Sequence, residues 1–287
     1  MKAKGWLHGR YRYCKLLNFR MNAVKNKIVF IALAGLLAAA RADDLPNVLT
    51  LGGGIGIGPR FSGSDENVVG PVAGIDYQMA NGFYASTLRG IGYGRAFGPL
   101  TVGAALGYRG ERSEHDRRGL GGARGSTALR GMGDVKGSAT AMLQARYEIV
   151  DGLDLTLQAE LPISHRENGR TLQVGVTGTL FEGGADQVTL SLSATLADRD
   201  YMQTYYGVTA AQAMRSGYGQ FRPKAGLYET ELGLNWRHTI NDRWSLTAMV
   251  GVTSLRRDAA RSPLSGKDTA PTGALIATWR YRRARRV

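Results

Sequence analysis

The stretch LTVGAALGYR, residues 100–109, decides the fold class, because apolar residues alternate in it with small or polar ones. An alternation of period two is typical of a β-strand whose two faces meet different surroundings. LDLTLQAEL at 153–161 and VTLSLSATL at 188–196 repeat the pattern. Similar stretches lie at about 47–58, 69–78, 83–95, 134–149, 170–181, 225–238, 242–255 and 271–282. The chain is therefore predicted to be all-β.

The length of these stretches and the position of their aromatic residues suggest a membrane protein. The stretches hold about 10–14 residues, more than the usual globular strand of about 5–6 and enough to cross a bilayer at a tilt. Aromatic residues fall mostly near their ends, as in the girdles of an outer-membrane barrel. They are Tyr77, Phe83, Tyr84, Tyr93, Phe97, Tyr108, Tyr147, Phe181, Trp236, Trp244, Trp279 and Tyr281. A soluble β-sandwich gives the same alternation and is the alternative at this point.

The N-terminal residues add an export signal, which favours the barrel. Residues 21–42, MNAVKNKIVFIALAGLLAAARA, have the basic start, apolar run and small-x-small site of a secretory signal peptide, with cleavage expected after Ala42. The apolar run is too short for a transmembrane helix. Residues 1–20 are interpreted as a mis-started or extended leader, and 43–287 as the mature chain. We predict a transmembrane antiparallel β-barrel, closed because lipid cannot satisfy the backbone groups of an open sheet edge.

The number of strands stays open at this stage. Eleven stretches are counted, whereas a bacterial single-chain barrel has an even number. Counting back from the C-terminus, long connections at about 256–270, 199–224, 164–169 and 110–133 alternate with tight turns at 239–241, 182–185 and 150–151. This alternation predicts long outer loops and short periplasmic turns. Only the connections before residue 98 do not follow it. Either a strand is missed there or 47–58 is not a regular strand, so ten or twelve strands are predicted, with twelve favoured.

The net charge of +14 does not indicate a nucleic-acid partner. Residues 1–42 hold nine basic and no acidic residues, which leaves 28 basic against 23 acidic residues in the mature chain. Five of these 28 lie in the last eight residues, RYRRARRV, so 281–287 is predicted to be a basic C-terminal tail. The only cysteine, Cys14, lies in the leader, which excludes a disulfide or a cysteine-based metal site from the mature chain.

Motifs that would indicate catalysis or a cofactor are not found. GGGIGIG at 52–58 matches neither a dinucleotide fingerprint nor a phosphate loop. Asp154 and Glu160 share one strand face, where paired acid/base chemistry is conceivable but a polar barrel lumen is commoner. The mature histidines, which lack metal-ligand spacing, are His115, His165 and His238. We therefore predict no catalytic, cofactor-binding or metal site, and a non-enzymatic protein.

Two of the long connections are candidate binding segments. Residues 110–133 mix both charge signs with glycine and are predicted to be a mobile, solvated outer loop. In 201–220, YMQTYYGVTAAQAMRSGYGQ, Thr209 is a predicted helix N-cap and Gly217 a predicted stop. So short a helix must pack on something, and the segment is predicted to constrict the barrel mouth or to meet a partner, although a loop that merely caps the barrel fits equally. The side chains concerned are Tyr201, Tyr205, Tyr206, Tyr218, Phe221, Arg222 and Lys224.

The same segment carries a family resemblance. Together with FRPKAG at 221–226, LGLNWRHTINDRWSLTAMVGVTSLRRDAARSPL at 232–264 and PTGALIATWRY at 271–281, it resembles the MipA/OmpV family of outer-membrane proteins. Residues 62–78, SGSDENVVGPVAGIDYQ, also look like that family. One departure is that family members usually end on an aromatic residue, whereas this chain continues past Tyr281.

The resemblance implies a function without implying catalytic residues. It implies a protein of the Gram-negative outer membrane, surrounded by its lipid, that acts as a scaffold in murein synthesis and hydrolysis. The implied partners are a murein lytic transglycosylase and a penicillin-binding synthase. Other members of the family resemble adhesins or small porins, so a small-solute porin or a ligand-binding barrel is the alternative. The oligomeric state is not indicated.

Overall fold

The computed structural model describes residues 47–116, 118–119, 122–123 and 125–282. The predicted leader, its cleavage site at Ala42 and the tail beyond Arg282 lie outside these ranges. Among the described residues no helix is long and apolar enough to cross a membrane.

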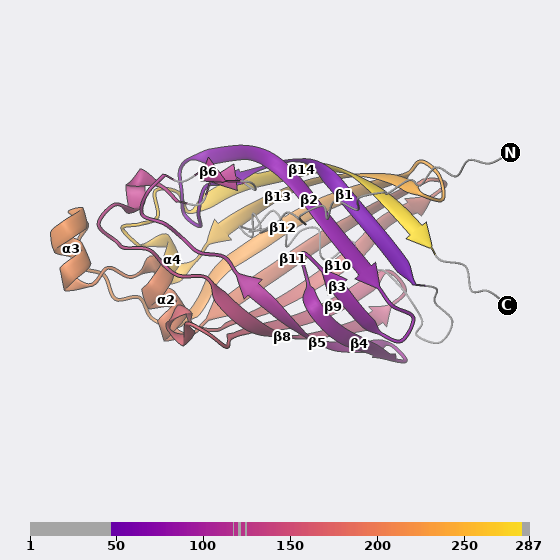
Figure 1. Ribbon diagram of the computed structural model, residues 1–287, viewed down its shortest axis with the longest axis horizontal. Helices are drawn as coiled ribbons and strands as arrows, with labels where there is room; N and C mark the ends of the chain where they lie inside the picture. The colour runs from indigo at the N-terminus through magenta and orange to yellow at the C-terminus, as the bar shows by residue number, and fades with distance from the viewer. Residues whose placement is uncertain (1–46, 117, 120–121, 124, 283–287) are drawn as a thin grey trace, which may run out of the picture.

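Twelve of the described strands close into one antiparallel barrel (Figure 1). Its wall consists of β1 (Val48–Pro59), β2 (Asn67–Gln78), β3 (Phe83–Ser86), β4 (Gly90–Phe97), β5 (Leu100–Arg109), β8 (Ser138–Val150), β9 (Leu153–Pro162), β10 (Thr171–Gly183), β11 (Asp186–Ala197), β12 (Gly226–Thr239), β13 (Trp244–Leu255) and β14 (Thr269–Arg282). The barrel closes where β1 pairs with β14, from Val48 opposite Arg282 to Ile57 opposite Gly273. The barrel prediction is confirmed, and the sandwich alternative is wrong.

The sequence pattern gives eleven strands instead of twelve because it does not show the turn between β3 and β4. The stretch predicted as a single strand at 83–95 is two strands, β3 and β4, which pair with each other from Phe83 opposite Tyr93 to Ser86 opposite Gly90. Gly90 has φ +82°, a left-handed conformation that glycine adopts without steric cost. The segment 47–58, the other suspect, is a regular strand that pairs on both sides.

The hairpin formed by β3 and β4 is short, and it leaves part of the wall incomplete. β2 pairs with β3 only through Asp76–Gln78. Just beyond, the backbone of Ile75 bonds to Thr87 on the same side. Pro71 lies on β2 four residues before Ile75, on the same edge of the strand, where β3 no longer pairs with it. A proline has no backbone N–H, so it leaves no donor unpaired at such an edge. β7 (Gly122–Ala123), which pairs with β6 (Arg118–Gly119), lies against β2.

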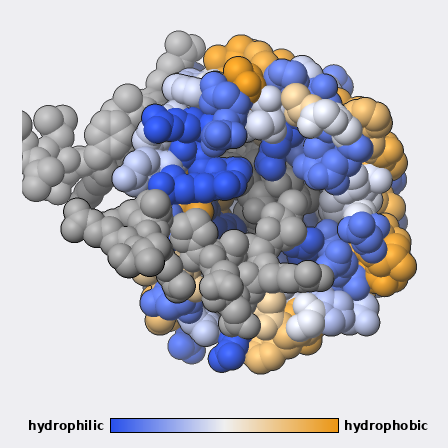
Figure 2. Space-filling model, turned by 90° about the vertical axis from the view of Figure 1, so that its right-hand side faces the viewer, coloured by the Kyte–Doolittle hydropathy of each residue, from blue (hydrophilic) through white to orange (hydrophobic). Residues whose placement is uncertain are grey.

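The outer face of the barrel is apolar and the two ends differ. Large apolar residues such as Ile55, Val69, Ile91 and Leu106 are exposed on it. An exposed apolar belt of this extent is suited to lipid. Figure 2 looks onto the short-turn end, where hydrophilic residues gather round the mouth and hydrophobic ones lie at its periphery.

The long connections gather at the opposite end, as predicted. They carry α2 (Arg199–Tyr206), α3 (Ala210–Ser216), α4 (Arg257–Ala260) and the 3₁₀ helices η1 (Thr127–Leu129) and η2 (Arg166–Asn168). In Figure 1 the three α-helices lie at the left-hand end, and the ends of β1 and β14 that lead to the termini lie at the right. The long connections therefore cover one mouth of the barrel.

Candidate functional site

The segment that interrupts the strand pattern forms two helices rather than one. α3 is the predicted helix: Thr209 and Gln212 form a reciprocal capping box, and Gly217 ends it with φ +79°. α2 was missed by sequence reasoning. Its N-cap is Asp198, whose side chain accepts a hydrogen bond of 2.9 Å from the backbone N–H of Tyr201. We call residues 199–224, which contain both helices, the outer cap.

Three of the predicted tyrosines lie on α2, where they pack together with another tyrosine, from the barrel wall. Tyr201, Tyr205 and Tyr206 meet Tyr228 of β12, and these four residues are named the tyrosine cluster. The Tyr201 ring lies 4.5 Å from that of Tyr205 and 5.0 Å from that of Tyr228, centroid to centroid. The Tyr201 hydroxyl donates to the Tyr228 hydroxyl at 3.2 Å. The outer cap is thus anchored to β12.

Apolar side chains complete this anchor. Met202 and Tyr206 of α2 are each 1% exposed and pack with Leu255 at the end of β13 and Ala259 of α4. The Tyr206 hydroxyl lies 2.5 Å from the hydroxyl of Ser62, which belongs to the connection between β1 and β2. The cap is therefore fixed to three different parts of the mouth.

Two arginines bind the cap from the other side of the mouth. The Arg109 guanidinium, at the end of β5, lies 5.1 Å from the Tyr201 ring centroid, a cation–π distance. The Arg112 guanidinium donates to the carbonyl oxygens of Thr204 and Tyr205 at 3.0 and 2.8 Å. These carbonyls end α2, where a cation also complements the helix dipole. Neither arginine was a predicted site residue, because nothing in the local sequence connects 109–112 with 201–206.

The remaining predicted residues divide into two groups. Tyr218 and Phe221 pack on a second buried cluster, and the Tyr218 hydroxyl donates to the carbonyl of Ala128 at 2.8 Å. The side chains of Arg222 and Lys224 are exposed, and only the backbone N–H of Lys224 is held, by Asp258 at 2.8 Å. The structure brings five of the seven predicted side chains into packed contact and leaves two at the surface. The second cluster consists of Phe61, Leu129, Met132, Val208 and Leu264.

The prediction of a mobile, solvated loop at 110–133 is wrong for much of its described part. Leu129 and Met132 are 1% and 4% exposed because they pack in the second cluster beneath the outer cap. The Glu114 carboxylate accepts hydrogen bonds from the backbone N–H groups of Gly131 and Gly133, both at 2.8 Å. A loop with so many buried apolar and polar contacts is a structural part of the cap.

Ionisation of the tyrosine cluster gives a testable pH dependence. Burial raises the pKa of Tyr201 to about 12, and burial also raises the pKa values of Tyr205 and Tyr206. These hydroxyls hold their protons more tightly in the folded cap than in an unfolded chain, where the pKa of tyrosine is about 10. Their contribution to the free energy of unfolding is therefore fully present below pH ~10. We expect the free energy of unfolding of the cap to fall as the pH rises from about 10 to about 12.

Tyrosinate absorbance and near-ultraviolet circular dichroism along an alkaline titration measure this loosening. The variant Tyr201→Phe cannot ionise at that position, so its transition is expected at higher pH. A cap that detaches well below pH ~10, or a Phe variant that titrates like the parent, contradicts the assignment.

The lumen carries charged side chains that neutralise one another. Asp154 and Glu160, the two carboxylates that the sequence placed on one face, pair with Arg146 at 2.8 Å and Arg109 at 3.1 Å. Each carboxylate thus has its own arginine, an arrangement that fits a polar lumen better than an acid/base pair. Near the hairpin of β3 and β4, Arg89 pairs with Asp76 at 2.7 Å.

The histidines occupy separate places in the described chain. His165 lies near Glu167 in the connection between β9 and β10, and His238 near Asp186 at the short-turn end. His115 is exposed. Within the described ranges no three His, Cys, Asp or Glu side chains are grouped so that they could hold a metal ion.

A closed antiparallel barrel with an apolar outer face, a charged lumen and long loops at one end defines a transmembrane β-barrel of the outer-membrane class. The chain belongs to the family of the MltA-interacting protein MipA, whose model matches residues 51–281.

The solved structures that match the chain include porins and channels of low sequence identity. The KdgM porin is 9% identical over 80% of this chain and 98% of its own, with a TM-score of 0.42. An outer-membrane channel from Pseudomonas putida F1 is 11% identical over 86% and 98%, also with a TM-score of 0.42. The CymD monoaromatic hydrocarbon channel is 8% identical over 84% and 90%, with a TM-score of 0.39. No curated protein matches the sequence.

Proposed function

We propose that this protein is a non-enzymatic scaffold of the Gram-negative outer membrane that holds murein-cleaving and murein-synthesising enzymes near the membrane. The observation that carries the proposal is the match to the MltA-interacting family over residues 51–281, which is nearly the whole barrel. The packed outer cap supports it, because a mouth covered by folded loops suits an interaction protein better than an open channel. In this proposal the mature chain begins at Asp43, and the short-turn end faces the periplasm, where murein lies.

A binding experiment with purified partners tests the scaffold. We expect an immobilised murein lytic transglycosylase, and separately a penicillin-binding synthase, to retain the refolded chain 43–287 with saturable affinity. A variant in which 199–224 is replaced by a short turn is the matched control, because the cap lies at the end opposite the short turns, which face the periplasm in this proposal. Retention that is absent in the parent, or that depends on the outer cap, counts against a periplasmic scaffold.

A small-solute pore is the second candidate, and the charged lumen favours it. Arginine–carboxylate pairs such as Arg146 with Asp154 give the interior of the barrel a polar lining. Barrels of about eight strands are filled by side chains and those of about sixteen leave a channel, so twelve strands suit the passage of small solutes only. Planar-bilayer conductance of the parent barrel and of a barrel without the outer cap tests this candidate.

A further inference from the structure

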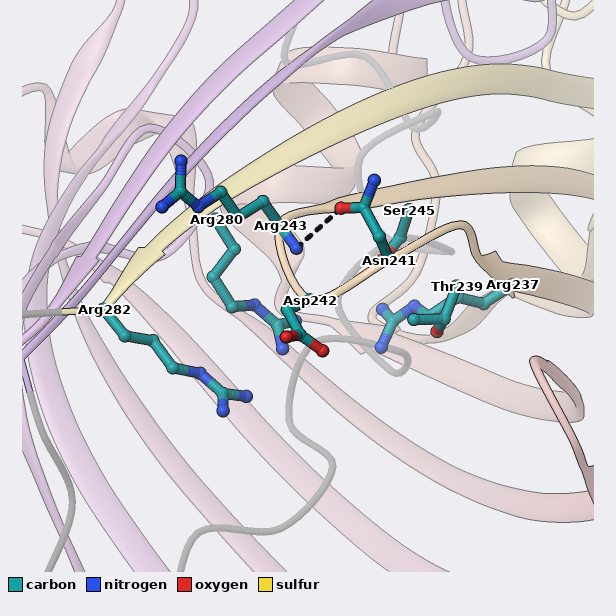
Figure 3. A pocket seen from close by; sticks show the side chains of 8 residues that line it. All are labelled: Arg237, Thr239, Asn241, Asp242, Arg243, Ser245, Arg280 and Arg282. Atoms are coloured by element: carbon teal, nitrogen blue, oxygen red, sulfur yellow. Dashed lines mark hydrogen bonds between the residues drawn. The ribbon is translucent and has the colours of Figure 1, made fainter.

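Four arginines line a cavity at the short-turn end of the barrel (Figure 3), the end opposite the outer cap (Figure 1). Arg237 comes from β12, Arg280 and Arg282 come from β14, and Arg243 comes from the turn between β12 and β13. The cavity has a volume of about 200 Å³. Its other lining residues are polar and include one acid; they are Thr239, Asn241, Asp242 and Ser245.

The strand pattern directs three of these arginines to the lumen. On β14 the aromatic residues Trp279 and Tyr281 alternate with Arg280 and Arg282. Because successive side chains of a strand point to opposite faces, rings on the lipid side place the guanidinium groups on the lumen side. Trp236 and Arg237 of β12 follow the same rule. The site is therefore reached from the aqueous mouth rather than from the lipid.

Arg280 and Arg282 differ from the other described arginines of the lumen, because no carboxylate is paired with them. Elsewhere in the lumen Arg89, Arg109 and Arg146 each pair with a carboxylate. Within the described part of the chain, Arg280 and Arg282 form no ion pair, and Asp242 is the only acid that lines the cavity. Like charges gathered in a partly enclosed space repel one another, and a bound anion relieves that repulsion.

The geometry of the side chains fits a small anion. In Figure 3 the guanidinium groups of Arg237, Arg280 and Arg282 are directed toward the part of the cavity where the Asp242 carboxylate lies, whereas Arg243 extends away. The hydroxyl groups of Thr239 and Ser245 add neutral donors. Guanidinium groups bind oxyanions through paired N–H donors, which makes arginine the preferred residue for such ligands.

We propose that this cavity is a binding site for a doubly charged oxyanion, with the phosphoryl group as the chemistry it fits best. Since a water molecule occupies about 30 Å³ in the liquid, the cavity has room for a tetrahedral oxyanion with part of its hydration. It is smaller than the pockets of about 300–1,000 Å³ that hold drug-sized ligands. Two sources could supply the phosphoryl group: free phosphate in the periplasm, or a phospholipid headgroup that reaches round the rim.

Titration with inorganic phosphate tests the site. Calorimetry on refolded 43–287 in an uncharged detergent is expected to give saturable binding that weakens with added salt. Removing one charged donor with Arg280→Gln is expected to weaken binding at least about tenfold. Arg280→Lys keeps the charge but loses the paired donors, so an intermediate affinity is expected.

A matched control removes the same charge at the opposite end of the barrel. Arg170 is exposed just before β10, among the long connections, and Arg170→Gln should leave phosphate binding unchanged. The heat-dependent gel mobility of each variant reports whether the barrel has folded. If the folded parent shows only salt-insensitive, non-saturable heats, or if folded Arg280→Gln binds like the parent, the proposal is overturned.

The two sources of phosphate are separated by a second titration in lipid nanodiscs. If anionic phospholipid in the nanodisc weakens the binding of free phosphate, the headgroup is the natural occupant of the site. If neutral and anionic nanodiscs give the same affinity, the site takes a free oxyanion from the periplasm. The result with murein enzymes does not enter either titration, so this proposal and the scaffold proposal stand or fall separately.

Discussion

Replacing residues 199–224 with a two-residue turn is expected to turn a silent barrel into a conducting one. Ala197 and Gly226 pair directly across β11 and β12, so a tight turn can join them without disturbing the wall. The replacement removes α2 and α3, and with them three rings of the tyrosine cluster and the helix end that Arg112 holds. What remains is a twelve-stranded wall with a charged lumen.

Planar-bilayer conductance of the parent and the shortened barrel measures this change. The variant Met214→Ala serves as control, because its side chain on α3 is 84% exposed and its loss leaves the cap in place. If both barrels are folded and silent, the lumen is closed by its own side chains and the pore candidate fails. If the parent already conducts as well as the shortened barrel, the cap does not constrict the mouth.

Met202→Ala is expected to destabilise the packing of the outer cap strongly. The Met202 side chain is 1% exposed among Tyr206, Tyr228 and Leu255, and truncating a buried methionine costs about 2–5 kcal/mol. Met214→Ala makes the same chemical change at the surface of the same segment, where a shift within about 0.5 kcal/mol is expected. A difference between the two variants therefore reports the effect of burial, because the side chain removed is the same in both.

Amide hydrogen exchange in α2 is the appropriate measurement, because the cap can open while the barrel stays closed. Exchange of the α2 amides should accelerate strongly in Met202→Ala, and exchange in β12 and β13 far less. Equal protection of α2 in the two methionine variants would show that α2 is held by its polar contacts alone.

The closed barrel could be predicted from the sequence because lipid demands a simple alternation, but the turn at 87–89 could not. The residues that face outward are Phe83 and Ala85 on β3, and Ile91 and Tyr93 on β4, so odd-numbered positions face lipid on both strands. A three-residue turn preserves this parity, and the alternation therefore continues through the reversal without a break. The positive φ of Gly90 marks the turn in the structure, but a glycine at that position of a glycine-rich strand gives no distinct signal.

Only part of the candidate site could be predicted, because helix caps give local signals and contacts between distant residues do not. Capping signals at Thr209 and Gly217 are local, and they located α3 correctly. A similar signal is present for α2, since Asp198 precedes apolar residues at helical spacing, Met202 and Tyr206 among them, but the crowded tyrosines do not show on their own that they form a helix. Tyr228, Arg109 and Arg112 could not be found in this way, because they meet α2 only in the folded barrel: Tyr228 lies on the strand after the cap, and the two arginines lie across the mouth.

The incomplete stretch of wall beside β2 affects the radius of the barrel. The number and stagger of hydrogen-bonded strands set the width of a barrel wherever the ladder is complete. Beyond Ile75 the ladder between β2 and β3 stops, so at that level strand pairing no longer dictates the circumference. There the rim is held by side chains, such as Arg60 at the end of β1, which bonds to Asp116 at 2.9 Å. Strand pairing therefore sets the circumference of the short-turn end, whereas the diameter of the opposite rim depends on how its loops pack.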